Sequence, residues 1–186
     1  MIWFTSDLHL GHDRDFIYTP RGFKSVSEMN AIEVQNWNKC VQPDDDIYVL
    51  GDFFMGDDFD FVRDTLAKLQ GKIHLIVGNH DTDAKLEIYR ESSNVVEICY
   101  ATMLKYHGIN LYLSHYPTIT TNNNDYPNKV KVFNLFGHTH SKDKFYYFIP
   151  YMYNVSVDAQ YNYPVSIDRV VIDLLRVQEG TPCDEV

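Results

Sequence analysis

Residues 135–140 read LFGHTH, in which two apolar residues and a glycine are followed by His138, Thr139 and His140. The chain has eight histidines, and two of them stand here within three residues, at the end of a hydrophobic run. Such a pair is consistent with a chance arrangement on the surface, with a proton relay, or with ligands of an ion held above a strand end. The sequence around this stretch has to decide among the three.

Other apolar runs end in polar residues in the same way. Short strands are predicted over residues 2–5, 47–50 and 72–78, and they run into the pairs Ser6-Asp7, Gly51-Asp52 and Asn79-His80. Helices are predicted between them, from the capping box Ser25-x-x-Glu28 to about residue 40, then over 60–70 and 83–90. This alternation of strand and helix predicts a sheet with helices on its faces.

The second half of the chain is predicted to add strands. Residues 95–106 and 109–114 alternate around the turn His107-Gly108 and indicate a hairpin. The aromatic run 145–153 is expected as a strand against the core, although its tyrosines would also suit a homodimer face or stacking on a base. Residues 164–166 begin a last helix or strand, and the tail after residue 178 is expected to fray.

No repeat or linker divides the chain, so a single domain is expected over residues 1–186. We predict an α/β sandwich made of two packed sheets, or of one bent sheet, flanked by helices. The content of 45% hydrophobic residues predicts a folded globular protein. Cys40, Cys99 and Cys183 form no metal or redox motif and are expected to be free thiols.

The formal net charge of -10 limits the partners of this protein. Long nucleic acid and anionic membranes both require a basic face, so neither is an expected partner. No run approaches the length of a membrane span, and the N-terminus enters strand-like sequence without a basic and apolar leader. A cytoplasmic protein is therefore expected.

The polar residues at the strand ends are expected to converge, because ligands of open α/β sheets bind beyond the carboxyl ends of the strands. Each position offers an oxygen or an imidazole nitrogen. Asp7 and His9, like His138 and His140, are two residues apart, which places both side chains of a pair on one side of an extended segment. The full set consists of Asp7, His9, Asp52, Asn79, His80, His115, His138 and His140. Together these residues indicate a site for divalent cations.

In type and order these motifs resemble those of the calcineurin-like metallophosphoesterases. The resemblance runs from residue 5 to about residue 140 and is typical of small bacterial or phage members without a cap domain. It implies a four-layer αββα sandwich of two mixed sheets and a dinuclear metal centre. It assigns Asp7, His9 and His140 to one metal, assigns Asn79, His115 and His138 to the other, and makes Asp52 the bridge.

The resemblance also implies roles for residues that hold no metal. His80 would protonate the leaving oxygen or stabilise the pentacoordinate state. Asp81 would orient the ring of His80, or alternatively cap the following helix. Their place in the loop after the first motif, rather than the resemblance, makes His12, Arg14, Arg21 and Lys24 candidates for contact with the phosphate or the leaving group, and a solvated loop is the alternative.

Two cations about 3.5–4 Å apart can share a hydroxide and hold a phosphoryl group between them. We therefore expect a metal-dependent phosphoesterase that attacks small phosphate esters with a dinuclear-metal-bridged hydroxide and favours phosphodiesters over monoesters. Nitrogen and oxygen ligands without thiolate suit manganese, our first expectation, and also iron, zinc, cobalt or nickel. The alternatives are a nuclease on DNA or RNA and a scaffold without activity on the same fold. The missing basic stripe argues against the first, and the complete ligand set argues against the second.

Overall fold

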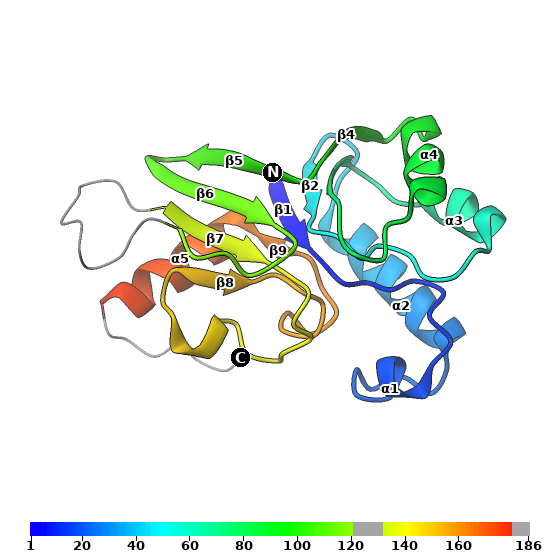
Figure 1. Cartoon of the computed structure of the whole chain (residues 1–186), viewed down its shortest axis with the longest axis horizontal. Helices are drawn as coiled ribbons and strands as arrows, with labels where there is room; N and C mark the ends of the chain where they lie inside the picture. Colours follow the sequence, from blue (N-terminus) through cyan, green and yellow to red (C-terminus); the bar gives the residue numbers. More distant parts are fainter. Residues whose placement is uncertain (121–131, 180–186) are drawn as a thin grey trace.

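The computed structural model describes residues 1–120 and 132–179 (Figure 1). Its first sheet has five strands in the order β4-β3-β2-β1-β9. Four of them are parallel, namely β1 (Ile2–Thr5), β2 (Asp46–Val49), β3 (Lys72–Ile76) and β4 (Val95–Cys99). The short edge strand β9 (Val165–Ser166) is antiparallel to β1.

The second sheet has four strands in the order β5-β6-β7-β8. β5 (Ala101–Tyr106) and β6 (Ile109–Ser114) form an antiparallel hairpin around His107 and Gly108. β7 (Val132–Phe136) and β8 (Met152–Asn154) continue the sheet in parallel with β6. Both sheets are therefore mixed, as the sequence resemblance implied.

Three of the described α-helices begin at a residue whose side chain caps them. Ser25 accepts a hydrogen bond from the backbone N–H of Glu28 at the start of α2 (Val26–Cys40). Asp58 caps α3 (Phe59–Leu66) and Ser166 caps α5 (Ile167–Gln178) in the same way. α1 (Asp15–Tyr18) and α4 (Asp83–Glu91) complete the set of α-helices in the described part of the chain. No helix among the described residues is both long and apolar enough to cross a membrane.

Two hydrophobic clusters explain how sheets and helices are layered. Ile47 and Val49 of β2 pack with Trp37 of α2 and with side chains of α3 and α4, in the cluster that joins the first sheet to its helices. Phe4 and Leu50 belong to the second cluster, which they share with β6, β7, β8 and α5. Successive residues of a strand point to opposite faces, so each central strand contributes to both clusters. Figure 1 shows α2, α3 and α4 on the side of the first sheet away from the second sheet.

The structure corrects two boundaries predicted from the sequence. Residues 95–106 are not one strand, because β4 pairs with β3 in the first sheet and β5 starts the second sheet after Tyr100. The helix predicted over 60–70 ends at Leu66. Residues 164–166 begin both the strand β9 and, through the cap Ser166, the helix α5, as predicted. Cys40 and Cys99 are free thiols as predicted, while Cys183 and the tail from residue 180 lie outside the described residues.

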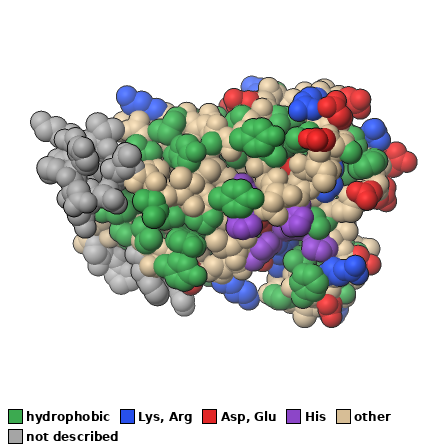
Figure 2. Space-filling model, viewed as in Figure 1, with side chains coloured by type: hydrophobic (Ala, Val, Ile, Leu, Met, Phe, Trp, Pro, Cys, Tyr) green, Lys and Arg blue, Asp and Glu red, His purple; other side chains and the backbone are tan. Residues whose placement is uncertain are grey.

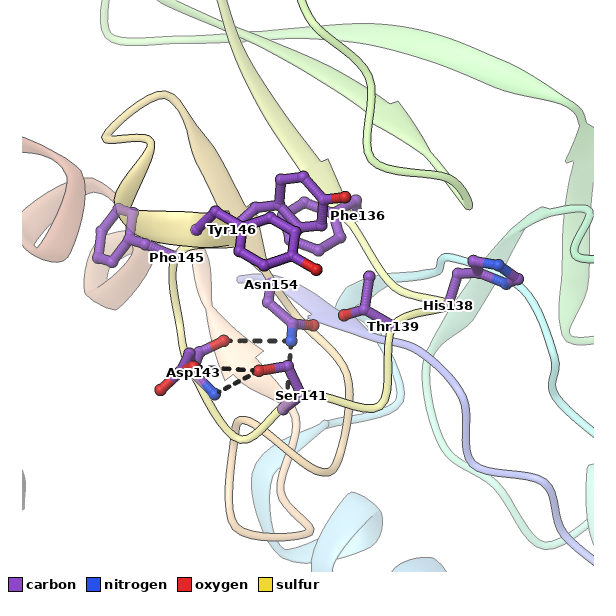
Figure 3. Close-up of a pocket in the computed structure, with 9 residues that line it drawn as sticks. Phe136, His138, Thr139, Ser141, Asp143, Phe145, Tyr146 and Asn154 are labelled. Carbon is purple, nitrogen blue, oxygen red and sulfur yellow. Dashed lines mark hydrogen bonds between the residues drawn. The ribbon is translucent and has the colours of Figure 1, made fainter.

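The aromatic run 145–153 is the largest departure from the prediction. Only β8, at its end, is a strand, and the 3-10 turn η1 (Tyr146–Phe148) precedes it. Tyr153 is fully buried, but the side chain of Tyr147 is 78% exposed. The turn therefore directs part of this run away from the core. Figure 3 shows the rings of Tyr146 and Phe136 beside one another in the cavity that the turn helps to form.

The strands that carry the polar motifs place their carboxyl ends at one rim. Asp7 follows β1, Asp52 follows β2 and Asn79 follows β3 in the first sheet. His115 follows β6 and His138 follows β7 in the second. Figure 2 shows that histidine side chains gather near the middle of one face, with hydrophobic side chains beside them.

Candidate metal centre

Backbone hydrogen bonds join the segments that follow the strands. The N–H of Asp7 donates to the carbonyl of Gly51 at 3.0 Å, and the N–H of His9 donates to the carbonyl of Asp52 at 3.0 Å. In the second sheet, Gly137 N–H donates to the carbonyl of His115, also at 3.0 Å. These bonds fix the spacing of the ligand segments independently of their side chains.

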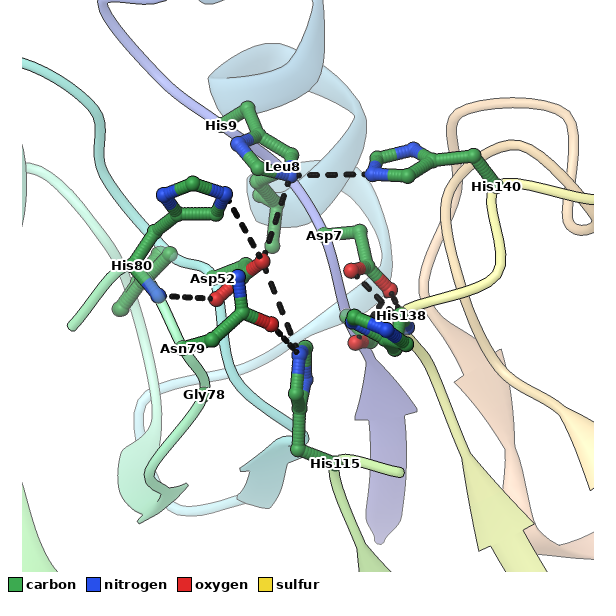
Figure 4. Close-up of polar contacts among 12 residues, drawn as sticks. Asp7, Leu8, His9, Asp52, Gly78, Asn79, His80, His115, His138 and His140 are labelled. Atoms are coloured by element: carbon green, nitrogen blue, oxygen red, sulfur yellow. Dashed lines mark hydrogen bonds and ion pairs between the residues drawn. The ribbon is translucent and has the colours of Figure 1, made fainter. Parts of the chain in front are cut away.

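Two groups of side chains face each other at this rim (Figure 4). The first consists of Asp7, His9 and His140, and the second consists of Asp52, His115 and His138. Within each group, the candidate ligand atoms all lie within 4.8 Å of one another. Each group brings together residues to which the sequence resemblance assigned one metal or, for Asp52, the bridge. The side-chain oxygen of Asn79 lies 2.8 Å from His115 Nε2, which brings it to the second group.

The carboxylate of Asp52 lies between the two groups. Its Oδ2 atom is 3.6 Å from Nε2 of His9 and 3.6 Å from Nε2 of His115. Its Oδ1 atom accepts a hydrogen bond from the backbone N–H of His80 at 2.8 Å. One oxygen of Asp52 is thus close to both histidine ligands, as a shared carboxylate requires.

The ligand residues adopt an unusual backbone conformation. Five of them have positive φ angles, namely Asp7 (57°), His9 (50°), Asp52 (53°), His138 (68°) and His140 (50°). The left-handed region is disfavoured for residues with a Cβ atom, and such strain is concentrated at functional sites. Gly137 allows the close approach of the two sheets here, because a Cβ atom at this position would collide with Ser6 and Asp7.

The side chains of the second group point electron-pair donor atoms at one another, an arrangement that a bound cation would stabilise. His115 Nδ1 lies 2.8 Å from the carbonyl oxygen of Leu50, which can only accept, so this nitrogen carries the proton of the neutral ring. In a ring of this tautomer Nε2 carries a lone pair, which faces the amide oxygen of Asn79 and the carboxylate of Asp52. Neutral imidazole and hard oxygen ligands suit a divalent transition metal.

In the first group, Asp158 fixes the ring of His140. Its Oδ2 atom is 2.9 Å from His140 Nδ1, so Nδ1 carries the proton and Nε2 points toward His9 Nε2 at 3.2 Å. Burial lowers the pKa of His140, but the hydrogen bond to Asp158 and the charge of Asp7 outweigh burial and raise it overall. The sequence analysis missed Asp158, which lies in a turn after β8 and matches no local motif.

Arg21 holds Asp158 and the first ligand segment together. Its guanidinium donates to both carboxylate oxygens of Asp158, at 2.9 and 3.0 Å, and to the carbonyl oxygens of Asp7 and Leu8, at 2.7 and 2.9 Å. The side chain is buried and also pairs with Glu33 at 3.2 Å. Arg21 was considered as a contact for substrate, but these bonds commit it to positioning the site.

Burial gives the ligands unusual pKa values in the absence of a cation. Burial raises the pKa of Asp7 to about 6, although the charges of His140 and His115 oppose the change. The pKa of His9 is lowered to about 2 by burial and by the charges of His140 and Arg21. The pKa of His138 is also lowered, mainly by burial and then by His115. Neutral His9 and His138 are the forms that bind metal ions.

His80 belongs to neither group of ligand atoms. Its ring is 44% exposed, and Nε2 lies 4.0 Å from Oδ2 of Asp52. Lys85, which is buried, donates to the carbonyl of His80 at 2.8 Å and to that of Phe54 at 2.7 Å. The backbone of His80 is therefore held from both sides, while its ring faces the open side of the site.

Asp81 makes neither of the contacts that were predicted for it. Its carboxylate accepts hydrogen bonds from the backbone N–H groups of Asp52, Phe53 and Gly78 and from the hydroxyl of Tyr89. Among the described residues it has no hydrogen bond to the ring of His80, and the N-cap of α4 is Thr82. Asp81 thus ties together the segments that follow β2 and β3.

The structure brings His12 to the site, and the charge of the exposed Arg14 acts on His12. The rings of His12 and His9 lie 5.5 Å apart, and burial together with the charge of His80 lowers the pKa of His12. The exposed Arg14 side chain has no hydrogen bond or ion pair in the described part of the chain. The site contains a further aromatic side chain, since Tyr116 packs against His138 at 4.7 Å.

Comparison with known proteins agrees with this geometry. A family model described as calcineurin-like phosphoesterase matches residues 1–180. An uncharacterized protein from Methanocaldococcus jannaschii is 30% identical over 175 residues, which are 91% of this chain and 89% of that protein. The Gene 66 protein of Mycobacterium phage L5 is 35% identical over 81 residues, 42% of this chain and 39% of that protein. The crystal structure of a protein of unknown function from Aquifex aeolicus matches with a TM-score of 0.70 and 26% identity, covering 94% of this chain and 98% of that chain.

Proposed function

The chain belongs to the calcineurin-like phosphoesterase family, and on this basis we propose that it hydrolyses small phosphodiesters in preference to phosphomonoesters. The family assigns it to the phosphoric ester hydrolases that depend on divalent metal ions. The observation that carries the proposal is the pair of ligand groups with Asp52 between them. We infer that each group holds one divalent cation, with manganese as the first candidate and iron, zinc, cobalt or nickel as alternatives.

Two divalent cations, when bound, supply an activated water as the nucleophile and positive charge against the phosphoryl oxygens. Asp7, His9 and His140 would hold one of them, and Asn79, His115 and His138 would hold the other, with Asp52 shared. The protein therefore needs no basic face to bind one phosphate group, despite its net charge of -10.

His80 would donate a proton to the leaving oxygen of the ester. Its ring is partly exposed and belongs to neither ligand group, while its backbone is fixed by Asp52 and Lys85. A side chain in this position can donate a proton to the leaving oxygen without having to dissociate from a metal ion. His12, beside His9, is in place to contact the same ester.

The preference for diesters follows from the charges available at the site. A diester carries one negative charge, and a monoester carries up to two near neutral pH. Arg21 and Lys85 reach the ligand segments but are committed to carboxylate and carbonyl oxygens of the protein. These two cationic side chains would therefore do little to neutralise the second negative charge of a monoester.

One pair of variants tests the proposal. Asp52→Asn should lose bound metal and activity together, because its carboxylate serves both groups. His80→Gln should keep the metals, measured by elemental mass spectrometry, and lose about two to four orders of magnitude in kcat on a small diester, the usual contribution of an acid–base group. His107→Gln, in the turn between β5 and β6, is the matched control and should leave both quantities unchanged.

Wild-type protein should bind close to two manganese ions per chain after reconstitution. A chelator should abolish its activity, and manganese should restore it. Full activity in a sample shown to be free of metal would contradict the proposed function. Loss of metal from His80→Gln would contradict only the role given to His80.

A further inference from the structure

A cavity of about 470 Å³ lies beside the second ligand group, between the segment that follows β7 and the turn η1. Small-molecule sites commonly have volumes of about 300–1,000 Å³ and combine aromatic walls with a few polar groups. His138 belongs both to the lining of the cavity and to the second ligand group. The cavity therefore adjoins the proposed phosphate site at His138.

Aromatic rings form one wall of the cavity (Figure 3). The rings of Phe136 and Tyr146 lie 5.7 Å apart and nearly perpendicular, at 83°, and those of Tyr146 and Tyr147 lie 4.5 Å apart at 74°. Tyr147 has a positive φ of 43° and remains largely exposed. Neither packing in the core nor backbone preference explains this arrangement, because the left-handed conformation is unfavourable for tyrosine.

Polar groups stand opposite these rings. Thr139, between the two histidines of the HTH motif, has a buried hydroxyl oxygen without a hydrogen-bond partner. A buried hydroxyl without a hydrogen-bond partner is unfavourable, and a ligand that hydrogen-bonds to it would remove this cost. Ser141 and the exposed Asp143 also line the cavity, and the Asp143 carboxylate can accept hydrogen bonds from a ligand.

From this juxtaposition we propose that the cavity binds the nucleobase of a nucleotide ester whose phosphate lies at the two ligand groups. The inference rests on the proposed function and specifies its substrate. A planar base can stack on Tyr146 or Tyr147 while its edge pairs with Thr139 and Asp143. A quaternary ammonium group would also suit aromatic rings and a carboxylate, but it has no donor or acceptor for Thr139 and is much smaller than the cavity.

Matched ligands isolate the contribution of the base. Guanosine 5′-monophosphate and ribose 5-phosphate share a phosphate and a sugar and differ in the base alone. Their dissociation constants should be measured by calorimetry on manganese-loaded protein, with phosphocholine as the third ligand. Stacking of the base on an aromatic side chain favours the nucleotide, which should bind at least about fivefold more tightly than ribose 5-phosphate. Tighter binding of phosphocholine than of the nucleotide would overturn the inference.

Variants locate the effect in the cavity. The quantity compared is the affinity ratio, the dissociation constant of ribose 5-phosphate divided by that of guanosine 5′-monophosphate. Tyr146→Ala should reduce this ratio toward one. Thr139→Val, which keeps the shape of the side chain, should reduce it in part. Tyr147→Ala is a second test that avoids destabilisation, since this side chain is largely exposed. Tyr100→Ala, at an exposed tyrosine between β4 and β5, is the control and should keep the wild-type ratio.

The same experiment separates this inference from the proposed function. A ratio near one in wild-type protein that hydrolyses small diesters would overturn the base site alone. A large ratio that depends on Tyr146, in protein that hydrolyses no ester, would support the base site and contradict the proposed activity. A large ratio that Tyr146→Ala and Tyr147→Ala both leave unchanged would show that the base binds elsewhere and overturn the inference.

Discussion

Replacing the buried ligand Asp7 by asparagine should stabilise the protein in the absence of metal. Asp7 is fully buried, and burial raises its pKa to about 6 from an ordinary value of 3.8. Near neutral pH the folded protein must therefore keep a charged carboxylate in a poorly solvated place. Its Oδ2 atom accepts hydrogen bonds from Ser6 and from the N–H of His138, and an asparagine oxygen at the same position can keep both, while the longer contact of that N–H to Oδ1, at 3.0 Å, is lost.

The size of the effect follows from the two pKa values. The folded state binds the Asp7 proton more tightly than the unfolded state, so this proton stabilises the fold fully below pH 3.8, and the stabilisation is lost as the pH rises through 6. A tenfold change in an equilibrium constant corresponds to about 1.4 kcal/mol, so the complete loss is about 3 kcal/mol. Asp7→Asn should avoid that loss, with a gain of about 3 kcal/mol at pH 8 and about half as much at pH 5.

Urea unfolding in chelator, followed by the fluorescence of the buried Trp37, measures these free energies. The comparison must be between variant and wild type at each pH, because His9, with its pKa held near 2, makes both proteins less stable as the pH falls below 6.5. The exposed Asp60→Asn is the matched control and should change little. Manganese should reverse the order, because it stabilises only a protein that binds it. A variant less stable than wild type at pH 8 in chelator would refute the reasoning.

Two further predictions concern the site and its substrate. Asp158→Asn removes the carboxylate that fixes His140 and pairs with Arg21. In a metal titration, the ion held by the first group should therefore bind about 10–100-fold more weakly, while the second ion is retained. Equal weakening of both ions would contradict this prediction. Small activated diesters such as bis-p-nitrophenyl phosphate should be cleaved faster than monoesters, and duplex DNA should be cleaved least, because a net charge of -10 repels a polyanion. Turnover of the three substrates at equal salt and manganese tests this, and DNA as the best substrate by a wide margin would show that the argument from charge fails.

The convergence of the candidate ligands was predictable from the sequence, because the motifs that carry them follow recognisable strands. The segments before Asp7, Asp52 and Asn79 are short apolar runs, and parallel strands place their carboxyl ends at one rim. The hairpin around His107 was also predictable, since alternation and a turn signal are local properties. The break at Tyr100 was not, because it depends on which sheet each half of residues 95–106 joins.

The residues that position the ligands could not be found in the same way. Arg21 and Asp158 contact each other across 137 residues of sequence, and Lys85 reaches the carbonyl of Phe54, 31 residues before it, while their own surroundings in the chain contain no motif. Composition misled the prediction for the aromatic run, because tyrosine is common in strands and also on ligand-binding surfaces. The 3-10 turn at Tyr147 decides whether the tyrosines of this run lie in a strand or at the surface. It requires a positive φ angle at Tyr147, which strand or helix propensity does not predict for tyrosine.

The strain at the ligands shows which part of the molecule sustains the site. Asp7, His9 and Asp52 have left-handed backbones, and the surrounding protein has to compensate for their cost. Backbone hydrogen bonds from Asp7 and His9 to the segment after β2, together with Arg21 on the carbonyls of the first segment, provide this compensation. Because these contacts come from the protein itself, little binding energy has to be spent on ordering the ligand segments. The stability that Asp7 costs the metal-free protein is then a consequence of the same organisation.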